Sequence, residues 1–337
     1  MKLLVTGGAG FIGSNFIHYM LSESTDVEIV NLDALTYAGN LENLTAVEKN
    51  PAYSFIKCDI TSAADVTSVF EKHGFNAVIH FAAESHVDRS LHMGANQFIQ
   101  TNILGTQHLL DACRQYGIER YLHVSTDEVY GSLGPEGRFS ETSPIQPNNP
   151  YAATKAGSDF MVRAAWRSHG LNAVITRCSN NFGPYQFPEK LIPLIIINAL
   201  ENKPLPVYGD GMNIRDWIYV IDHCRGLDMV LRHGKAGEVY NIGGLHDVPN
   251  LEVIHYILKR LEKPESLIQF VKDRPGHDRR YAIDADKIRK ELGWEPLFSF
   301  ETALDATVDW YLAHRQWYER IRRGEYKTYY RTMYENR

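Results

Sequence analysis

The feature that most constrains this chain is a regular alternation of short apolar runs and longer helical patterns through its first half. The runs that read as strands are Leu3–Thr6, Val27–Leu32, Tyr53–Lys57, Ala77–Phe81, Arg120–Ser125 and Asn172–Arg177, and the first helix begins at Phe11. Such alternation predicts βαβ units and a parallel sheet covered by helices on both faces. The runs are apolar almost throughout, as expected of strands buried on two sides. The sequence therefore predicts an α/β fold of the Rossmann type, a doubly wound parallel sheet, with ligands at the carboxyl ends of its strands.

The second half of the chain has a different texture. Prolines interrupt it, and short strand-like pieces appear at 205–207, 214–219 and 238–242. We expect residues 1–178 to form the first domain, to which some later segments may return, and 179–337 to form mainly a smaller, interleaved C-terminal lobe that binds substrate.

The C-terminal tail is aromatic and basic. It contains Trp317, Tyr318, Arg322, Arg323, Tyr329, Tyr330 and Arg331. Two interpretations stay open, an amphipathic helix packed on the body or, less favoured, a surface for a partner.

Composition excludes several functional classes. The net charge of −6 leaves no global basic surface, so nucleic-acid binding is not expected. The four cysteines form no C-x-x-C pair, which predicts neither a disulfide framework nor a metal site and favours a reducing cytoplasm. No apolar stretch reaches about 18 residues and the first strand begins at once, so neither a membrane span nor a leader is expected.

A glycine pattern marks the predicted cofactor site. Gly7, Gly10 and Gly13 follow the first strand and open the first helix, where close backbone approach and free N–H groups suit a pyrophosphate. Asp33 follows Gly13 by twenty residues and ends the second strand, where a carboxylate binds ribose hydroxyls and repels a 2′-phosphate. No basic residue occurs from Asn31 to Asn40. NAD is therefore predicted in preference to NADP, the alternative being tight turns with capping carboxylates.

Further residues at strand ends fit the same site. Asp59 follows the third strand and can accept a hydrogen bond from an adenine amino group, although a local cap explains it too. The small residues Ala82 and Ala83 after the fourth strand let the chain pass close to a cofactor.

Tyr151 and Lys155 are spaced i, i+4 on a helix predicted to begin after Pro150, so both side chains leave one face. A phenol has a pKa near 10 and acts as a base near neutrality only where that pKa falls by roughly three, which costs about 4 kcal/mol. A neighbouring ammonium and a cofactor cation are expected to offset that cost.

At this point the chain resembles the extended short-chain dehydrogenase/reductase superfamily, through Thr6–Gly13, Asp33, Asp59 and the segment Tyr151–Lys155. The resemblance implies that Tyr151 takes the proton of a sugar hydroxyl while hydride passes to NAD, and that Thr126 hydrogen-bonds the same oxygen. It also implies cofactor contacts at Phe11, Ile12, Leu35, Thr36, Ile60, Phe81, Ser85, Thr101 and Asn181.

Two adjacent carboxylates, Asp127 and Glu128, follow the fifth strand, where they are costly unless they have a function. One held protonated and one ionised supply an acid and a base side by side, as elimination of water from a sugar requires. The segment Thr126–Gly131 is similar to the signature of the dTDP-glucose 4,6-dehydratases, in which the Asp is the acid and the Glu the base. That resemblance implies oxidation at C4 of dTDP-glucose, elimination across C5–C6 and return of hydride to C6, giving dTDP-4-keto-6-deoxyglucose, a rhamnose precursor in deoxysugar biosynthesis. A nucleotide-sugar 4-epimerase or decarboxylase, and outside the enzymes an NAD-sensing binding protein, are the alternatives.

The substrate contacts are implied by the resemblance alone. They are Ser85, Thr126, Asn180, Glu189, Lys190, Leu191, Pro206, Tyr208, Arg215, Asn250, Arg274 and His277. Either arginine suits a diphosphate, and each serves equally well as a surface salt bridge. The resemblance also implies a homodimer formed through helices around 97–116 and 151–169, and the preference for thymidine depends on it entirely.

Overall fold

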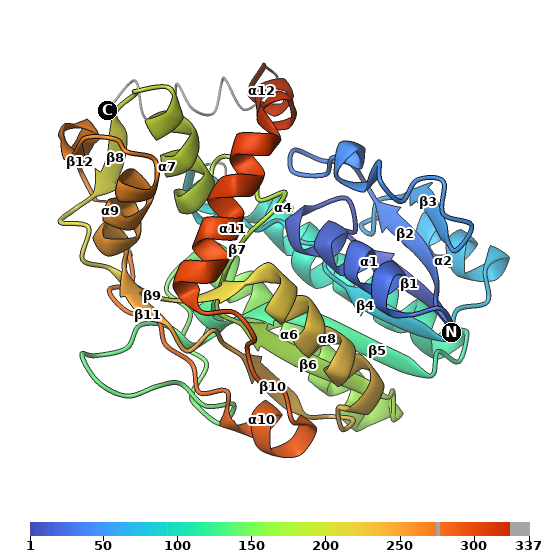
Figure 1. The fold of residues 1–337 in the computed structure, drawn as a ribbon. Helices are drawn as coiled ribbons and strands as arrows, with labels where there is room; N and C mark the ends of the chain where they lie inside the picture. Colours follow the sequence, from blue (N-terminus) through green and yellow to red (C-terminus); the bar gives the residue numbers. More distant parts are fainter. Residues whose placement is uncertain (93, 274–276, 324–337) are drawn as a thin grey trace.

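The computed structural model describes residues 1–92, 94–273 and 277–323, around a seven-stranded parallel sheet (Figure 1). Its strand order is β10-β6-β5-β4-β1-β2-β3. The strands are β1 (Lys2–Thr6), β2 (Glu28–Asp33), β3 (Tyr53–Lys57), β4 (Ala77–His80), β5 (Arg120–Thr126), β6 (Ala173–Cys178) and β10 (Val239–Ile242). Each predicted strand in this sheet ends within one residue of its observed boundary. The predicted Rossmann-type α/β fold is confirmed.

Helices cover both faces of this sheet because its strands bury apolar side chains on alternate sides. Leu3 and Val5 of β1 join the core under α1 (Phe11–Glu23), α8 (Val220–His233) and α10 (Asp286–Leu292). Leu4 joins the core under α2 (Ala63–Lys72), α5 (Thr106–Gln115) and α6 (Pro150–His169). Although α8 and β10 come from the second half of the chain, α8 packs on α1 and β10 pairs with β6.

The rest of the second half forms a smaller body beside the sheet (Figure 1). It contains the strands β7 (Asn180–Phe182), β8 (Leu205–Tyr208), β9 (Ile214–Tyr219), β11 (Asp247–Pro249) and β12 (Ile268–Val271), and the helices α7 (Leu191–Leu200), α9 (Asn250–Arg260) and α11 (Phe300–Ala313). One apolar core holds these helices together and includes Ile195, Ile254 and Leu304.

Short helical segments complete the description. They are α3 (Val87–His92), α4 (Asn96–Phe98), α12 (Arg315–Arg323), the π-helical segment η2 (Ile99–Gly105) and the 3₁₀ segments η1 (Leu41–Leu44), η3 (Asp127–Tyr130) and η4 (Glu265–Leu267). No helix of the described residues is long and apolar enough to cross a membrane.

The described part of the C-terminal tail is the helix α12, and it packs on the body. Trp317 and Tyr318 are 5% and 2% exposed. The Trp317 indole N–H donates to Asn43 Oδ1 at 2.8 Å, and Arg320 pairs with Glu42. The packed amphipathic helix, the favoured interpretation of the sequence, is confirmed for this segment, whereas Tyr329, Tyr330 and Arg331 lie outside the described residues.

Replacing Trp317 by alanine is expected to lower the free energy of unfolding by about 3 kcal/mol, because a large buried ring and a buried hydrogen bond are both lost. Denaturation in urea measures this. Trp317→Phe keeps most of the ring volume and loses only the indole N–H, so a loss of about 1 kcal/mol is expected of it. Equal stability of the alanine variant and the wild type would show that the packing of Trp317 does not stabilise the fold.

Candidate active site

The main cavity opens at the carboxyl ends of the parallel strands and has a volume of about 520 Å³. Of the predicted cofactor residues, seventeen line it: Gly7, Gly10, Phe11, Ile12, Gly13, Asp33, Thr36, Asp59, Ile60, Phe81, Ala82, Ala83, Ser85, Thr101, Tyr151, Lys155 and Asn181. Thr126, Asp127 and Glu128 line it as well. The structure thus brings together, in one cavity, residues that the sequence spreads from Gly7 to Asn181.

The glycines at the start of α1 leave room for a ligand against the backbone. Gly7 has a φ of 71°, and a Cβ on it would lie 2.5 Å from Ala82 N. A Cβ on Gly13 would lie 2.4 Å from Gly7 O. The N-cap of α1 is Gly10, so no side chain caps this helix, and its first turn holds no acidic residue. The backbone N–H groups there are available to an anion such as a pyrophosphate.

Asp33 ends β2 and is held by two backbone N–H groups. Ala9 N donates to its Oδ2 at 2.9 Å and Leu35 N to its Oδ1 at 2.8 Å. Burial raises the pKa of this carboxyl, and the two backbone bonds oppose the rise. A fixed, nearly buried carboxylate at the edge of the cavity suits recognition of ribose hydroxyls.

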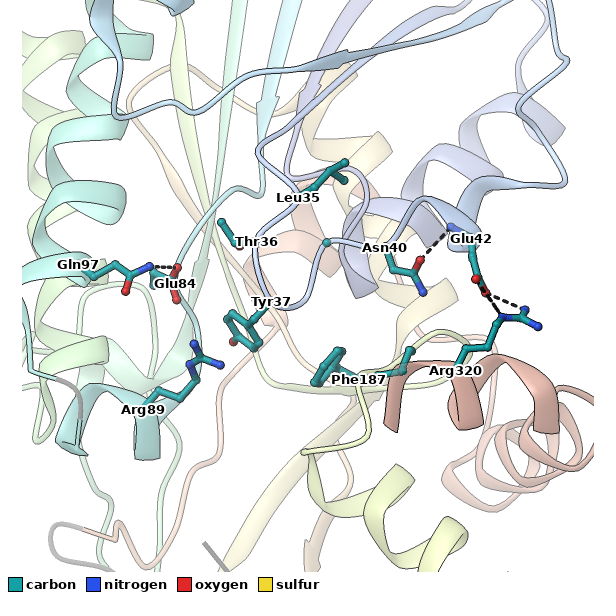
Figure 2. A pocket seen from close by; sticks show the side chains of 12 residues that line it. Leu35, Thr36, Tyr37, Asn40, Glu42, Glu84, Arg89, Gln97, Phe187 and Arg320 are labelled. Atoms are coloured by element: carbon teal, nitrogen blue, oxygen red, sulfur yellow. Dashed lines mark hydrogen bonds and ion pairs between the residues drawn. The ribbon is translucent and has the colours of Figure 1, made fainter. Parts of the chain in front are cut away.

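Leu35, predicted as a cofactor contact, is not among the residues that line this cavity. Leu35 has a φ of 55°, and this turn directly after β2 places it in a neighbouring pocket of about 540 Å³ (Figure 2). Its backbone N–H, rather than its side chain, reaches the site by holding Asp33.

Figure 2 also shows residues that sequence reasoning missed. Tyr37 and Glu84 line both pockets. The Arg89 guanidinium lies 3.8 Å from the centre of the Tyr37 ring, and Gln97 donates to Glu84 at 3.0 Å. Tyr37 lies four residues after Asp33, in the loop that follows β2. Its closeness in sequence to the predicted ribose-binding carboxylate was the one signal that could have indicated it.

The five predicted catalytic residues come from three elements, β5, η3 and α6. β5 ends at Thr126, and the 3₁₀ turn η3 starts at Asp127, with Thr126 Oγ1 accepting from Glu128 N at 3.3 Å. Helix α6 begins at Pro150 itself, with Asn149 as its N-cap, and carries Tyr151 and Lys155. All five line the cavity.

Asp127 is 2% exposed, and its Oδ2 has no hydrogen-bond partner within the described residues. Burial, and then the charges of Glu128 and Asp216, raise the pKa of this carboxyl well above its usual range, while Arg215 opposes the rise. The raised pKa favours the protonated form of Asp127, which is the form that an acid requires. Glu128 faces both the cofactor cavity and a second cavity beside it.

This raised pKa predicts a pH-dependent stability effect of Asp127→Asn. An ordinary aspartate ionises near pH 4, so above that pH the unfolded wild-type chain releases a proton that the folded chain keeps. Wild-type stability should therefore fall by up to about 1.4 kcal/mol per pH unit, until Asp127 ionises in the folded chain. The variant lacks this proton, so its advantage in unfolding free energy should grow from about pH 4 upward. Urea denaturation at several pH values measures it, with the exposed Asp26→Asn as baseline, and a pH-independent difference would contradict it.

The environment of Tyr151 differs from the expectation that neighbouring charge lowers its pKa. Burial and the Glu128 charge raise the phenol pKa, and a hydrogen bond with Thr126 works the other way. Burial lowers the pKa of Lys155 to about 8, and its ammonium donates to Val124 O at 2.8 Å. The cofactor cation, the other part of the expectation, is a charge that the chain itself does not supply.

A second cavity of about 170 Å³ adjoins the first. The two share six lining residues, Glu128, Asn180, Asn181, Gln186, Glu189 and Lys190. The predicted substrate residues Asn180, Glu189, Lys190, Leu191, Pro206, Tyr208, Arg215, Asn250 and His277 line it. Ser85 and Thr126 line the first cavity instead, and Arg274 lies outside the described residues.

Charged and polar groups in the second cavity contact one another. Arg215 donates to Asp278 O at 2.9 Å and lies over the Tyr281 ring. His86, which sequence reasoning missed, lies 3.8 Å from the Glu189 carboxylate, whose pKa burial raises to about 7. His86 is the neighbour in sequence of Ser85, which the sequence analysis does name. Among the described residues, no group of His, Cys, Asp and Glu side chains has the arrangement of a metal site.

Comparison with known proteins identifies relatives of the whole chain. The family model for GDP-mannose 4,6 dehydratase matches residues 4–307. A dTDP-glucose 4,6-dehydratase from Neisseria meningitidis is 52% identical, over 97% of each chain.

Solved structures of similar proteins include the same class of enzyme. A dTDP-glucose 4,6-dehydratase from Streptomyces venezuelae, solved with NAD bound, is 49% identical and superposes with a TM-score of 0.92, over 95% of this chain and 100% of that one. A UDP-glucuronic acid 4-epimerase from Bacillus cereus is more distant, at 30% identity and a TM-score of 0.87, over 93% of this chain and 99% of that one.

Proposed function

The chain belongs to the GDP-mannose 4,6 dehydratase family, and from this premise we propose that it converts dTDP-glucose to dTDP-4-keto-6-deoxyglucose and water. It is an NAD-dependent hydro-lyase of the extended short-chain dehydrogenase/reductase superfamily. The observation that carries the proposal is the pair Asp127 and Glu128 at the end of β5, beside Tyr151 and facing the cavity.

The cavity fits NAD on the chain's own features. The glycine-lined start of α1, where a Cβ on Gly7 or Gly13 would collide with backbone, suits the pyrophosphate. Asp33 suits the ribose hydroxyls, and Lys155 lies where it can hold the second ribose while it orients Tyr151. When bound there, NAD would bring a positive charge to the cavity and would supply the acceptor, and then the donor, of the transferred hydride.

We assign the proton transfers to three side chains. Tyr151 takes the proton of the C4 hydroxyl, which Thr126 also hydrogen-bonds. Oxidation at C4 makes the C5 proton acidic, and Glu128 removes it. Asp127 gives its proton to the departing C6 hydroxyl, which leaves as water. The hydride removed from C4 is returned to C6 while Glu128, after exchange with solvent, gives a proton back to C5. Proton exchange with solvent resets Tyr151 and Asp127, and oxidation at C4 and reduction at C6 cancel, so there is no net redox change.

The substrate is expected to extend from Glu128 into the second cavity, where its diphosphate meets Arg215. The remaining predicted contacts, including Asn180, Asn250 and His277, line that cavity. We assign residues 1–178, with the returning α8 and β10, to NAD binding and 179–337 mainly to substrate binding.

A 4-epimerase or decarboxylase uses the same tyrosine chemistry and is the alternative. An epimerase returns hydride to C4 and has no use for an acid and a base side by side at this position. Epimerase structures also match at only 30% identity.

Incubation with dTDP-glucose in D₂O tests the proposal. Loss of water with deuterium at C5, and no requirement for added NAD, is the expected result by mass spectrometry and NMR. A product of unchanged mass, apart from exchange, would indicate epimerisation and refute the proposal.

We further propose that the enzyme is a homodimer of the cytoplasm. Phe160 on α6 is 53% exposed, and Ile99 and Leu104 of η2 are also exposed, on the helices expected to pair. All four cysteines are free and buried, which suits a reducing compartment. Light scattering tests the dimer, and a mass equal to one chain would refute it.

A further inference from the structure

Asn149 connects two parts of the site that the reaction must keep in register. This residue is 7% exposed and immediately precedes helix α6. Its Oδ1 accepts from Ala152 N at 2.8 Å, which caps the helix that carries Tyr151 and Lys155. Its Nδ2 donates to Glu128 Oε2 at 3.2 Å. One side-chain amide thus contacts both the helix that carries Tyr151 and the carboxylate of Glu128.

The orientation of the Asn149 amide is fixed by the helix. Only its oxygen can accept from the Ala152 N–H, so the amide nitrogen is turned toward Glu128. A hydrogen bond from a neutral donor to a carboxylate is among the stronger kinds, and this one lies in a nearly buried place. The hydrogen bond restrains the Glu128 side chain, which projects from the short 3₁₀ turn η3.

We propose that Asn149 is a positioning residue for the elimination step, which aims the Glu128 carboxylate at the substrate from the N-terminus of the helix that carries Tyr151. The proposal rests on the function proposed above, because it takes Glu128 as the base. Asn149 is not expected to touch the substrate itself.

The neighbouring residue ties the same loop to the substrate side. Asn148 donates to Asp278 Oδ1 at 2.6 Å, and Asp278 O accepts from Arg215 in the second cavity. The loop between η3 and α6 is therefore held by two contacts, from Asn148 to Asp278 and from Asn149 to Glu128. Of these two asparagines, Asn149 is the one that contacts the base.

Asn149→Ser separates capping from positioning. Serine is as good an N-cap as asparagine, but its single oxygen is committed to Ala152 N and no donor extends toward Glu128. Single-turnover reaction with dTDP-glucose should show reduced NAD forming within about twofold of the wild-type rate and water loss slowed about tenfold. Reduced cofactor should accumulate transiently in this variant.

Two controls distinguish positioning from a structural role. Asn149→Ala removes cap and donor together, and Ser299→Ala removes the cap of α11, where the serine accepts from Thr302 N, without touching the cavities. In chains that already carry Glu128→Gln, Asn149→Ser should produce little further slowing of residual water loss, because the carboxylate it acts through is gone.

The outcomes are distinct. Equal slowing of NAD reduction and water loss, no slowing of either, or a full additional tenfold loss in the Glu128→Gln background would each overturn the role of Asn149. Failure of the wild type to reduce NAD or release water from dTDP-glucose would instead overturn the proposed function, and the positioning role with it.

Discussion

Tyr151→Phe should abolish reduction of NAD by dTDP-glucose, with a loss of about 10³-fold or more in the first step. Phenylalanine has no phenol to accept the C4 hydroxyl proton, and a positioned general base contributes about 10²–10⁴-fold. The loss should lie near the upper part of this range because Thr126, the other group on that oxygen, cannot act as a base. Absorbance of the reduced cofactor after rapid mixing measures the step directly.

The Phe ring should keep the fold intact, which makes the result interpretable. Tyr151 packs its ring against Val87 and Phe98, so Tyr151→Phe preserves those contacts. Its melting temperature and its affinity for dTDP-glucose should stay near wild type. NAD reduction at the wild-type rate would show that another group takes the proton, and the assignment of Tyr151 would be wrong.

The behaviour of Tyr151 shows where sequence reasoning stopped. The spacing of Tyr151 and Lys155 correctly predicted a shared helix face, because helical periodicity is local. The pKa of the phenol is set by burial and by Glu128, and burial depends on packing between distant segments. The sequence identified the neighbouring lysine but not the burial and the Glu128 charge that raise the phenol pKa.

The fold was more accessible than the site's electrostatics. Strands such as Tyr53–Lys57 and Ile214–Tyr219 were predicted with their observed bounds, because continuous or alternating apolar runs record burial directly. The return of α8 and β10 to the first sheet was allowed for without being located. Pairing of β10 with β6 joins residues far apart in sequence, and no local pattern encodes that register.

Some site residues were missed because their roles arise only in three dimensions. Tyr37 lies in the loop after β2 and lines both pockets, and no sequence motif indicates this position. Asn149 precedes Pro150, and only the structure shows that its side chain both caps α6 and contacts Glu128. Glycines and strand-end carboxylates can be recognised in a sequence as site residues from their residue type and position. A polar side chain that joins two distant partners cannot, because its partners are known only from the structure.

The dehydration itself depends on Glu128, so Glu128→Gln separates elimination from oxidation. Tyr151 should still take the C4 proton and NAD should still be reduced, but the amide cannot remove the C5 proton. Reduced cofactor should therefore accumulate to about one equivalent per site while water loss falls by about 10²–10⁴-fold. Rapid mixing followed by mass analysis of quenched samples measures both quantities.

Asp127→Asn is the matched control for Glu128→Gln, since it removes the acid next to the base. In D₂O, Asp127→Asn should lose water slowly but still exchange the C5 proton for deuterium, because exchange needs only the base and departure of the hydroxyl needs the acid. Glu128→Gln should also lose water slowly, but without exchange at C5. The two carboxylates are adjacent in sequence, but only Asp127 is nearly buried, with its pKa raised by that burial, while Glu128 faces both cavities. Wild-type C5 exchange by Glu128→Gln would reverse the assignment and make Asp127 the base.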